Sequence, residues 1–139
     1  MKYLLDTNAV SEFRRDKKMN PGFRRWAAAA DAAEFAISAL TVLELEIGYL
    51  RLRRRDPEQA AGVRNWLDGV VEPNFGGAIL PVTSDVLRRC APLHVPDPRP
   101  MLDSLLAATA LAHGLTMVTR NVRHFSFPGL AVLNPWEAA

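Results

Sequence analysis

The chain has 139 residues, a length that fits one domain with a sizeable hydrophobic core. Hydrophobic residues make up 49% and charged residues 23%, which is an ordinary globular balance. No apolar stretch approaches the ~20 residues of a membrane span, and Asp6 interrupts the N-terminus too early for a signal peptide. The single cysteine, Cys90, excludes an intrachain disulfide, so we expect a cytoplasmic protein with no membrane partner.

The net charge is only +2, but the pI is near 9.0 and the basic residues are clustered. The clusters are Arg14, Arg15, Lys17 and Lys18, and then Arg51, Arg53, Arg54 and Arg55. Such clusters are compatible with a phosphate-rich partner. A solvated helix face explains a charge run of this length equally well. Charge alone therefore leaves nucleic-acid binding open.

Strand and helix patterns alternate along the first half of the chain. A break at Asn20-Pro21-Gly22 separates two short helices, and Ser38 or Thr41 caps a long helix with apolar residues at helical spacing. The expected elements are strand Lys2–Leu5, helices Thr7–Arg15 and Phe23–Ala30, strand Glu34–Ser38 and the long helix through Arg55.

The second half continues the alternation. Asp56-Pro57 begins a helix on which Ala60, Val63, Trp66, Leu67 and Val70 share a face. The further expected elements are a turn at 74–77, strand Ala78–Val82, a helix from Thr83 or Ser84 to about Ala91, a proline-rich loop through Pro100, helix Met101–His113, and strands Leu115–Thr119 and Ala131–Leu133. Strands separated by helices predict a mainly parallel sheet covered on both faces. We therefore expect one α/β domain over residues 1–139, with three layers, α/β/α.

Three acids in separate segments point to a hard-metal site. Asp6 directly follows a buried strand, and ligands bind outside the carboxyl ends of strands in open α/β sheets. Glu44 and Asp103 lie at similar junctions. Each acid also has a purely structural explanation: Asp6 as a helix N-cap, Glu44 in a capping box with Thr41, and Asp103 as a first-turn acid that favours the helix dipole. The set is stronger evidence than any one of its members.

A polar cluster follows the last long apolar strand. Thr119 and Asn121 offer oxygens and donors that can orient a metal-bound water, although both residues also suit an ordinary strand-to-loop turn. The histidines lack the spacing of a zinc site. Only His124 lies near the proposed cluster in the sequence.

Four motifs in this chain resemble those of PIN-domain ribonucleases, and more narrowly of the VapC/FitB-like toxins of bacterial type II toxin–antitoxin pairs. The motifs are Leu4–Asn8, Glu44–Gly48, Asp103–Ala110 and Thr119–Asn121, and the likeness continues to Asn134-Pro135-Trp136. The resemblance implies a PIN-like α/β/α fold. It also implies a homodimer with a shared basic groove, a cognate antitoxin, and Mg²⁺- or Mn²⁺-dependent cleavage of RNA.

The resemblance assigns roles to residues. Asp6, Asp103 and Glu44 match the family's three metal-binding acids, and Glu44 would bind through water or act as the general base. Asn121 would complete the catalytic set, while Thr119 and Asn8 would position water or phosphate. The candidate residues for contact with the RNA backbone are Arg14, Arg15, Arg51 and Arg54. The fourth acid that the family often carries is replaced here by Asn121 or His124, which puts a second metal ion in doubt.

Two other functions compete with the nuclease. A phosphatase with Asp6 as nucleophile would need a second aspartate two positions later, where this chain has Asn8. A PIN-like RNA- or protein-binding module with a decayed site fits the missing fourth acid, whereas the three retained acids argue against it. The RNA target is open, because base preference depends on loop shape and stacking groups. Trp26, Trp66 and Trp136 offer stacking surfaces, but the helical spacing of Trp66 favours the core.

Overall fold

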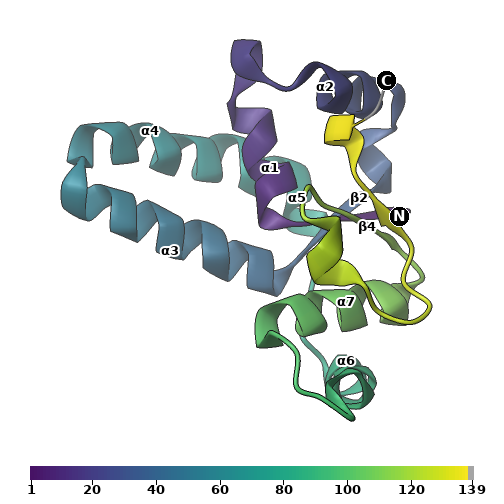
Figure 1. Cartoon of the computed structure of the whole chain (residues 1–139). Helices are drawn as coiled ribbons and strands as arrows, with labels where there is room; N and C mark the ends of the chain where they lie inside the picture. The colour runs from purple at the N-terminus through teal and green to yellow at the C-terminus, as the bar shows by residue number, and fades with distance from the viewer. Residues whose placement is uncertain (138–139) are drawn as a thin grey trace.

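A parallel sheet of five short strands forms the centre of the computed structural model, which describes residues 1–137 (Figure 1). The strand order is β3–β2–β1–β4–β5, and every neighbouring pair is parallel. The strands are β1 (Tyr3–Leu5), β2 (Phe35–Ser38), β3 (Ile79–Leu80), β4 (Thr116–Val118) and β5 (Val132–Leu133). The last two residues of the expected domain, Ala138 and Ala139, lie outside the described part.

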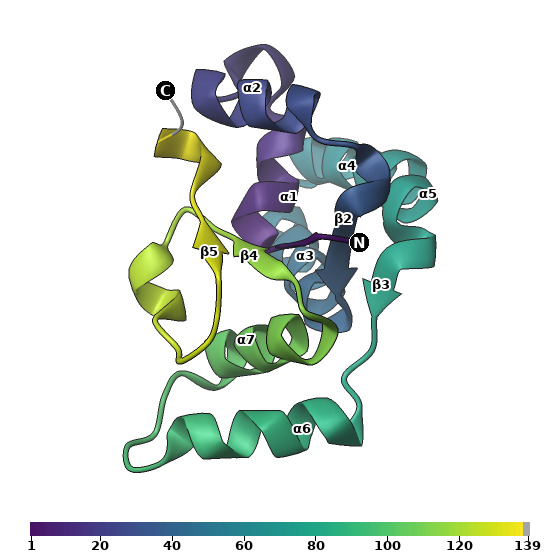
Figure 2. The same ribbon diagram turned by 90° about the vertical axis from the view of Figure 1, so that its right-hand side faces the viewer.

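Successive strand residues point to opposite faces of the sheet and build two separate cores. Leu4 and Met117 pack with Leu106 and other α7 residues on one face. Leu5 and Val118 pack on the other face, with residues of α1, α2 and α3. Figure 2 shows α7 and α6 below the sheet and α1 and α2 above it. The expected α/β/α fold with its parallel sheet is confirmed.

Seven α-helices connect and cover the strands within residues 1–137. They are α1 (Thr7–Arg14), α2 (Pro21–Ala29), α3 (Ala39–Arg55), α4 (Pro57–Trp66), α5 (Glu72–Phe75), α6 (Ser84–Cys90) and α7 (Met101–His113). Single helical turns of other types include η3 (Leu67–Val71, a π-helix) and η6 (Val122–Phe125). In this part of the chain no helix is long and apolar enough to cross a membrane.

The structure shows a helix cap at Asn20, where a break was expected, and selects Ser38 from the two candidate caps of the long helix. Asn20 is the N-cap of α2: its side-chain oxygen accepts the Phe23 N–H at 3.0 Å. Pro21 is the first residue of that helix, so the expected break at 20–22 is the start of α2. Ser38, and not Thr41, caps α3: its Oγ accepts the Leu40 N–H at 3.0 Å. The long helix therefore begins early, at the end of β2.

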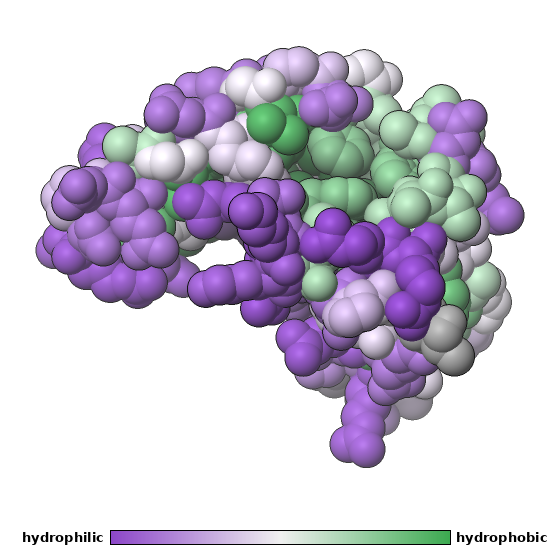
Figure 3. Space-filling view, turned by 90° about the horizontal axis from the view of Figure 1, so that it is seen from above, coloured by the Kyte–Doolittle hydropathy of each residue, from purple (hydrophilic) through white to green (hydrophobic). Residues whose placement is uncertain are grey.

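The helices α3 and α4 form a hairpin that extends from the body of the molecule (Figure 1). Asp56 joins them and caps α4 by accepting the Gln59 N–H. Seen from above, the end of the hairpin is covered by hydrophilic side chains, and the surface is hollowed between the hairpin and the body (Figure 3).

The segment after α4 departs from expectation. The predicted turn at 74–77 is wrong, because residues 72–75 form α5 and the glycines that follow form a 3-10 turn. Val70 does not share the buried face of Leu67: it is exposed, and Val71 is buried instead. The π-helical turn between α4 and α5 places Val71 against the sheet, a departure from 3.6-residue periodicity that a helical pattern does not anticipate.

Candidate functional site

The site lies at the carboxyl end of the two central strands. Asp6 directly follows β1 and Thr119 directly follows β4, and the Asp6 N–H donates to the Val118 carbonyl at 3.1 Å. The chain leaves β1 toward β2 on one side, while β4 pairs on the other side. This is a topological switch point, where helices diverge and leave a crevice for ligands.

Asp6 both caps α1 and faces a cavity. Its Oδ1 accepts the Ala9 N–H at 2.8 Å, so the structural explanation from the sequence holds. The residue is only 6% exposed. Burial raises the pKa of its carboxyl group, hydrogen bonds from Thr119 and Ala9 oppose that rise, and the charge of Glu44 adds to it. A buried carboxylate near a second one is a place where a cation is favoured.

Glu44 lies inside α3, beyond its first turn. Because Ser38 is the cap, the capping box of Thr41 with Glu44 does not form. Instead the Thr7 hydroxyl donates to Glu44 Oε1 at 2.6 Å, which joins α1 to α3. Thr7 is a site residue that sequence reasoning missed, and its place directly after Asp6 was the available signal.

Asp103 enters the site from the first turn of α7. Burial raises the pKa of its carboxyl group, while the nearby charges of His124 and Arg99 lower it. His124 Nδ1 lies 3.9 Å from Asp103 Oδ2, an ion pair when the imidazole is protonated. The sequence singled out His124 as the histidine nearest the cluster, and the structure places it at the cavity.

These groups surround one open cavity of about 210 Å³. Its lining consists of Asp6, Thr7, Asn8, Glu44, Asp103, Leu106, Asn121, His124 and Phe125. The structure thus brings together three segments that are far apart in the sequence. Thr119 is fully buried behind the lining, where its Oγ1 accepts the Asn121 N–H at 3.0 Å and so fixes the turn.

The four arginines predicted to contact RNA divide into two groups. Arg14 and Arg15 line a neighbouring cleft that also contains Thr7 and Glu44. Arg51 and Arg54 are exposed on the outer half of α3, apart from both cavities.

The donor set suits Mg²⁺ or Mn²⁺ in type, since all three acids offer oxygen ligands. Within residues 1–137, however, no three acidic, histidine or cysteine side chains converge closely enough to hold an ion between them. Mg²⁺ is commonly held by one or two carboxylates with waters and substrate phosphates. Asp6 and Asp103, both with raised pKa values, fit that sparser arrangement.

A hydrogen-bond network fixes the start of α7 and therefore Asp103. Arg99 N–H donates to His94 Nδ1 at 3.3 Å, so the ring proton lies on Nε2, which is 2.8 Å from Ser104 Oγ. Ser104 Oγ in turn donates to the Met101 carbonyl at 2.7 Å. The proline-rich loop is thereby tied to the helix that carries Asp103, a role for His94 that the sequence did not reveal.

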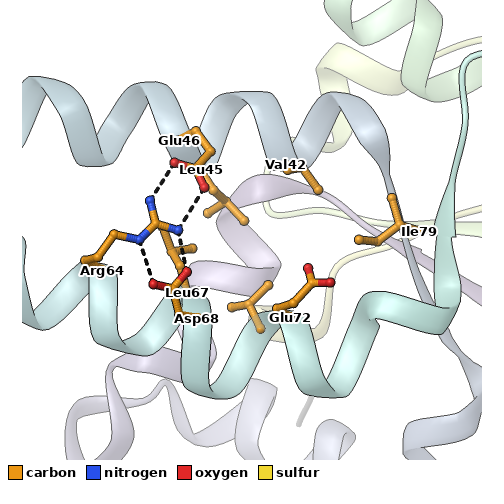
Figure 4. Close-up of a pocket in the computed structure, with 9 residues that line it drawn as sticks. Val42, Leu45, Glu46, Arg64, Leu67, Asp68, Glu72 and Ile79 are labelled. Atoms are coloured by element: carbon orange, nitrogen blue, oxygen red, sulfur yellow. Dashed lines mark hydrogen bonds and ion pairs between the residues drawn. The ribbon is translucent and has the colours of Figure 1, made fainter.

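A second network holds the hairpin that carries Glu44. Arg64 of α4 makes paired hydrogen bonds to Glu46 of α3, at 2.7 and 2.9 Å, and to Asp68, at 3.1 and 2.7 Å (Figure 4). The same guanidinium lies 4.9 Å from the centre of the Tyr49 ring. Glu46 is partly exposed, and its hydrogen bonds with Arg64 lower the pKa of its carboxyl group. We call this group of Glu46, Arg64 and Asp68 the clamp.

Comparison with known proteins agrees with the fold. A PIN-domain family model matches residues 3–129, and the chain belongs to the PIN-domain family. Within that family it is similar over nearly its full length to toxins of the VapC/FitB type. The resemblance seen in the four sequence motifs is therefore confirmed.

Two relatives illustrate the likeness. The VapC ribonuclease Y4jK of Sinorhizobium fredii is 33% identical, over 98% of this chain and 99% of the relative. The toxin FitB of Neisseria gonorrhoeae is 33% identical over 96% of this chain and 98% of the relative. The crystal structure of FitAcB from Neisseria gonorrhoeae superposes with a TM-score of 0.87 at 31% identity, covering 97% of this chain and 99% of that one.

Proposed function

We propose that this chain is a metal-dependent endoribonuclease and the toxin of a type II toxin–antitoxin pair. The observation that carries the proposal is the convergence of Asp6, Glu44 and Asp103 on one cavity at the switch point of a PIN-domain sheet. The raised pKa values of Asp6 and Asp103 support it, because both carboxyl groups lack a fixed positive partner strong enough to offset burial.

Asp6 and Asp103 would hold one Mg²⁺ or Mn²⁺ ion. When bound, such an ion lowers the pKa of water and stabilises negative charge on phosphoryl oxygens. Asp6 is fixed by its bond to Ala9, and the His94–Ser104 network fixes the first turn of α7, which carries Asp103.

We assign Glu44 the role of general base. The Thr7 hydroxyl fixes Oε1, and among the described residues no donor occupies Oε2, which is therefore left to take a proton from water. Asn121 and Asn8 line the cavity, and their side-chain amides would donate to a water or a phosphate oxygen. Hydrolysis would leave a 5′-phosphate and a 3′-hydroxyl.

The proposed partners follow from the relatives. Similarity to toxins of toxin–antitoxin pairs supports a cognate antitoxin that covers the acidic cavity. A homodimer with two sites facing a shared basic groove is the proposed assembly, and Arg14 and Arg15 beside the cavity give such a groove its charge. RNA as substrate matches the naming of the relative from Sinorhizobium fredii as a ribonuclease.

The decisive experiment incubates purified, antitoxin-free protein with total RNA, with and without Mg²⁺ or Mn²⁺. We expect discrete cleavage that requires the metal and is lost in Asp6→Asn and in Asp103→Asn. Asp31→Asn is the matched control, because Asp31 is also a capping aspartate but is exposed and does not line the cavity. Sequencing the cleaved ends would identify the target.

Two outcomes would contradict the proposal. Cleavage that survives in both site variants would reject the carboxylate mechanism. Folded wild-type protein without metal-dependent cleavage would favour a PIN-like binding module, which the absence of an acid at Asn121 and His124 already recommends as the second candidate.

A further inference from the structure

A second cavity, about 280 Å³ in volume, adjoins the acidic cavity. It is lined by residues of α1 and of the α3–α4 hairpin, and we call it the α1–α4 cleft. Thr7 and Glu44 line both cavities, and their hydrogen bond of 2.6 Å lies where the two meet. A chain-like ligand that has one unit bound over the acids would therefore place its neighbouring unit in the cleft.

The α1 wall of the cleft is positively charged. Arg14 lies in the last turn of α1, and Arg15 follows it. Within residues 1–137 Arg14 has no carboxylate partner, and its Nη2 would lie 3.5 Å from a Cβ added at Gly62, so the guanidinium reaches across to α4. Arg15 is 3.7 Å from Glu12. An unpaired guanidinium at a cleft favours an anion such as phosphate.

The hairpin wall presents two aromatic rings. Tyr49 of α3 and Trp66 of α4 line the cleft, and both are half-buried. Arg64, itself bonded to Glu46 and Asp68, lies 4.9 Å from the centre of the Tyr49 ring, and Arg53 lies 5.8 Å from it. These cation–π contacts favour one orientation of the ring. A ring that is ordered before binding loses little conformational freedom when a base stacks against it.

We propose that the α1–α4 cleft binds the nucleotide next to the scissile phosphate of a single-stranded RNA, with its phosphate on Arg14 and its base against Tyr49 and Trp66. The proposal rests on the nuclease function for the position of the scissile phosphate. The guanidinium of Arg14 can bind the phosphate of an unstacked nucleotide, and the aromatic rings beside it can stack on its base. A base inside a duplex does not offer its face, so single strands are selected.

Gly48 provides the steric test, because it lines the cleft and a Cβ there meets no heavy atom within 4 Å. The Cβ of Gly48→Leu therefore enters open space and its larger side chain is designed to occupy the cleft, while replacing glycine favours the helix. Gly69→Leu is the matched control: Gly69 has equally open space and lies outside the cleft. The probe is a short fluorescein-labelled single-stranded RNA of mixed sequence, measured by anisotropy in EDTA so that nothing is cut. We expect the affinity of Gly48→Leu to fall about tenfold and that of Gly69→Leu to be unchanged.

Arg14 provides the electrostatic test. Arg14→Gln is expected to reduce the slope of log K against log salt by about 0.7, the value for one phosphate contact on a single strand. Arg88→Gln, at an exposed position in the last turn of α6, is the control and should leave the slope unchanged. An equal slope in Arg14→Gln and wild type would remove Arg14 from the RNA path.

Failure of the cleft and failure of the nuclease give different results. Cleavage that depends on Asp6, together with unchanged RNA affinity and unchanged KM in Gly48→Leu, would overturn the cleft and leave the nuclease intact. Cleft-dependent affinity without any metal-dependent cleavage would reject the nuclease and retain the cleft as an RNA site. If Gly48→Leu releases a co-purifying partner protein yet binds RNA normally, the cleft belongs to that partner and the proposal is wrong.

Discussion

Asp6 combines a structural and a chemical task in one carboxyl group. Through Oδ1 it caps α1, and through its charge it shapes a cavity shared with Glu44 and Asp103. The two tasks respond differently to substitution, because an amide caps a helix as well as a carboxylate but carries no charge. Stability measurements can therefore separate them.

Asp6→Asn is expected to leave the free energy of unfolding at pH 7 equal to or above that of wild type. The amide retains the bond from Ala9 and removes a buried charge beside Glu44. Asp6→Ala is expected to cost about 1 kcal/mol, since it leaves that N–H without its cap. Urea denaturation of the three proteins measures both. A larger loss in Asp6→Asn than in Asp6→Ala would contradict this separation of tasks.

The raised pKa of Asp6 fixes the direction of a pH effect. The folded state binds the proton more tightly than the unfolded chain, whose carboxyl has the ordinary value of 3.8. Stability contributed by that proton is present below 3.8 and is lost as the pH rises through the folded pKa. In metal-free buffer, the free energy of unfolding of Asp6→Asn should therefore increase relative to that of wild type as the pH rises through this window. Thermal unfolding from acid to neutral pH tests it, and a constant difference would count against the shift.

Polar residues at strand ends could be predicted because the sequence pattern marks them. A buried apolar run that stops on Asp6 or Thr119 indicates a polar group at the sheet edge, and the structure has both there. The Thr7–Glu44 bond was not accessible, because it joins helices whose relative placement no local pattern encodes. The same holds for the contact between His94 and Ser104.

At the scale of elements, one guanidinium adds a polar link to the packed α3–α4 hairpin. The helix that carries Glu44 is tied to its neighbour by Arg64, which bonds to Glu46 and Asp68 (Figure 4). The sequence predicted both helices, since each has caps and a helical period. It did not predict the clamp, because Glu46 and Arg64 are 18 positions apart and only the hairpin geometry makes them adjacent.

Arg64→Leu is expected to lower the free energy of unfolding by about 1 kcal/mol at low salt, because the variant leaves Glu46 and Asp68 facing each other unpaired. The pair is partly exposed, so the loss should shrink in high salt. Arg89→Leu is the control: it breaks a single exposed contact to Asp85 and should cost only a few tenths. Equal losses in the two variants would show that the clamp adds nothing to an ordinary surface pair.

At the scale of the whole molecule, the acidic cavity joins β1, α3 and α7. A metal ion bound there links segments that separate when the chain unfolds, and so it stabilises the folded state. The parallel sheet that aligns these segments was predicted from the alternation of strands and helices. The lengths of the strands were not, because β3 and β5 contain only two residues each and owe their pairing to tertiary packing.

Mg²⁺ is expected to raise the free energy of unfolding of wild type by about 2.7 kcal/mol at a concentration one hundred times Kd. The double variant Asp6→Asn/Asp103→Asn should show no such gain, and Ca²⁺-free, EDTA-treated protein gives the baseline. Differential scanning calorimetry with increasing Mg²⁺ measures the effect. An equal gain in both proteins would place the ion elsewhere on the chain.

The order of strands also sets how much of the chain must be synthesised before the cavity can assemble. β1 is the first strand made, yet the strand that completes its edge, β4, begins only at Thr116. A nascent chain still on the ribosome holds Asp6 without Thr119, and the turn that places Asn121 does not exist until β4 has paired. A product that ends between Asp103 and Thr116 would therefore carry all three acids but no assembled cavity.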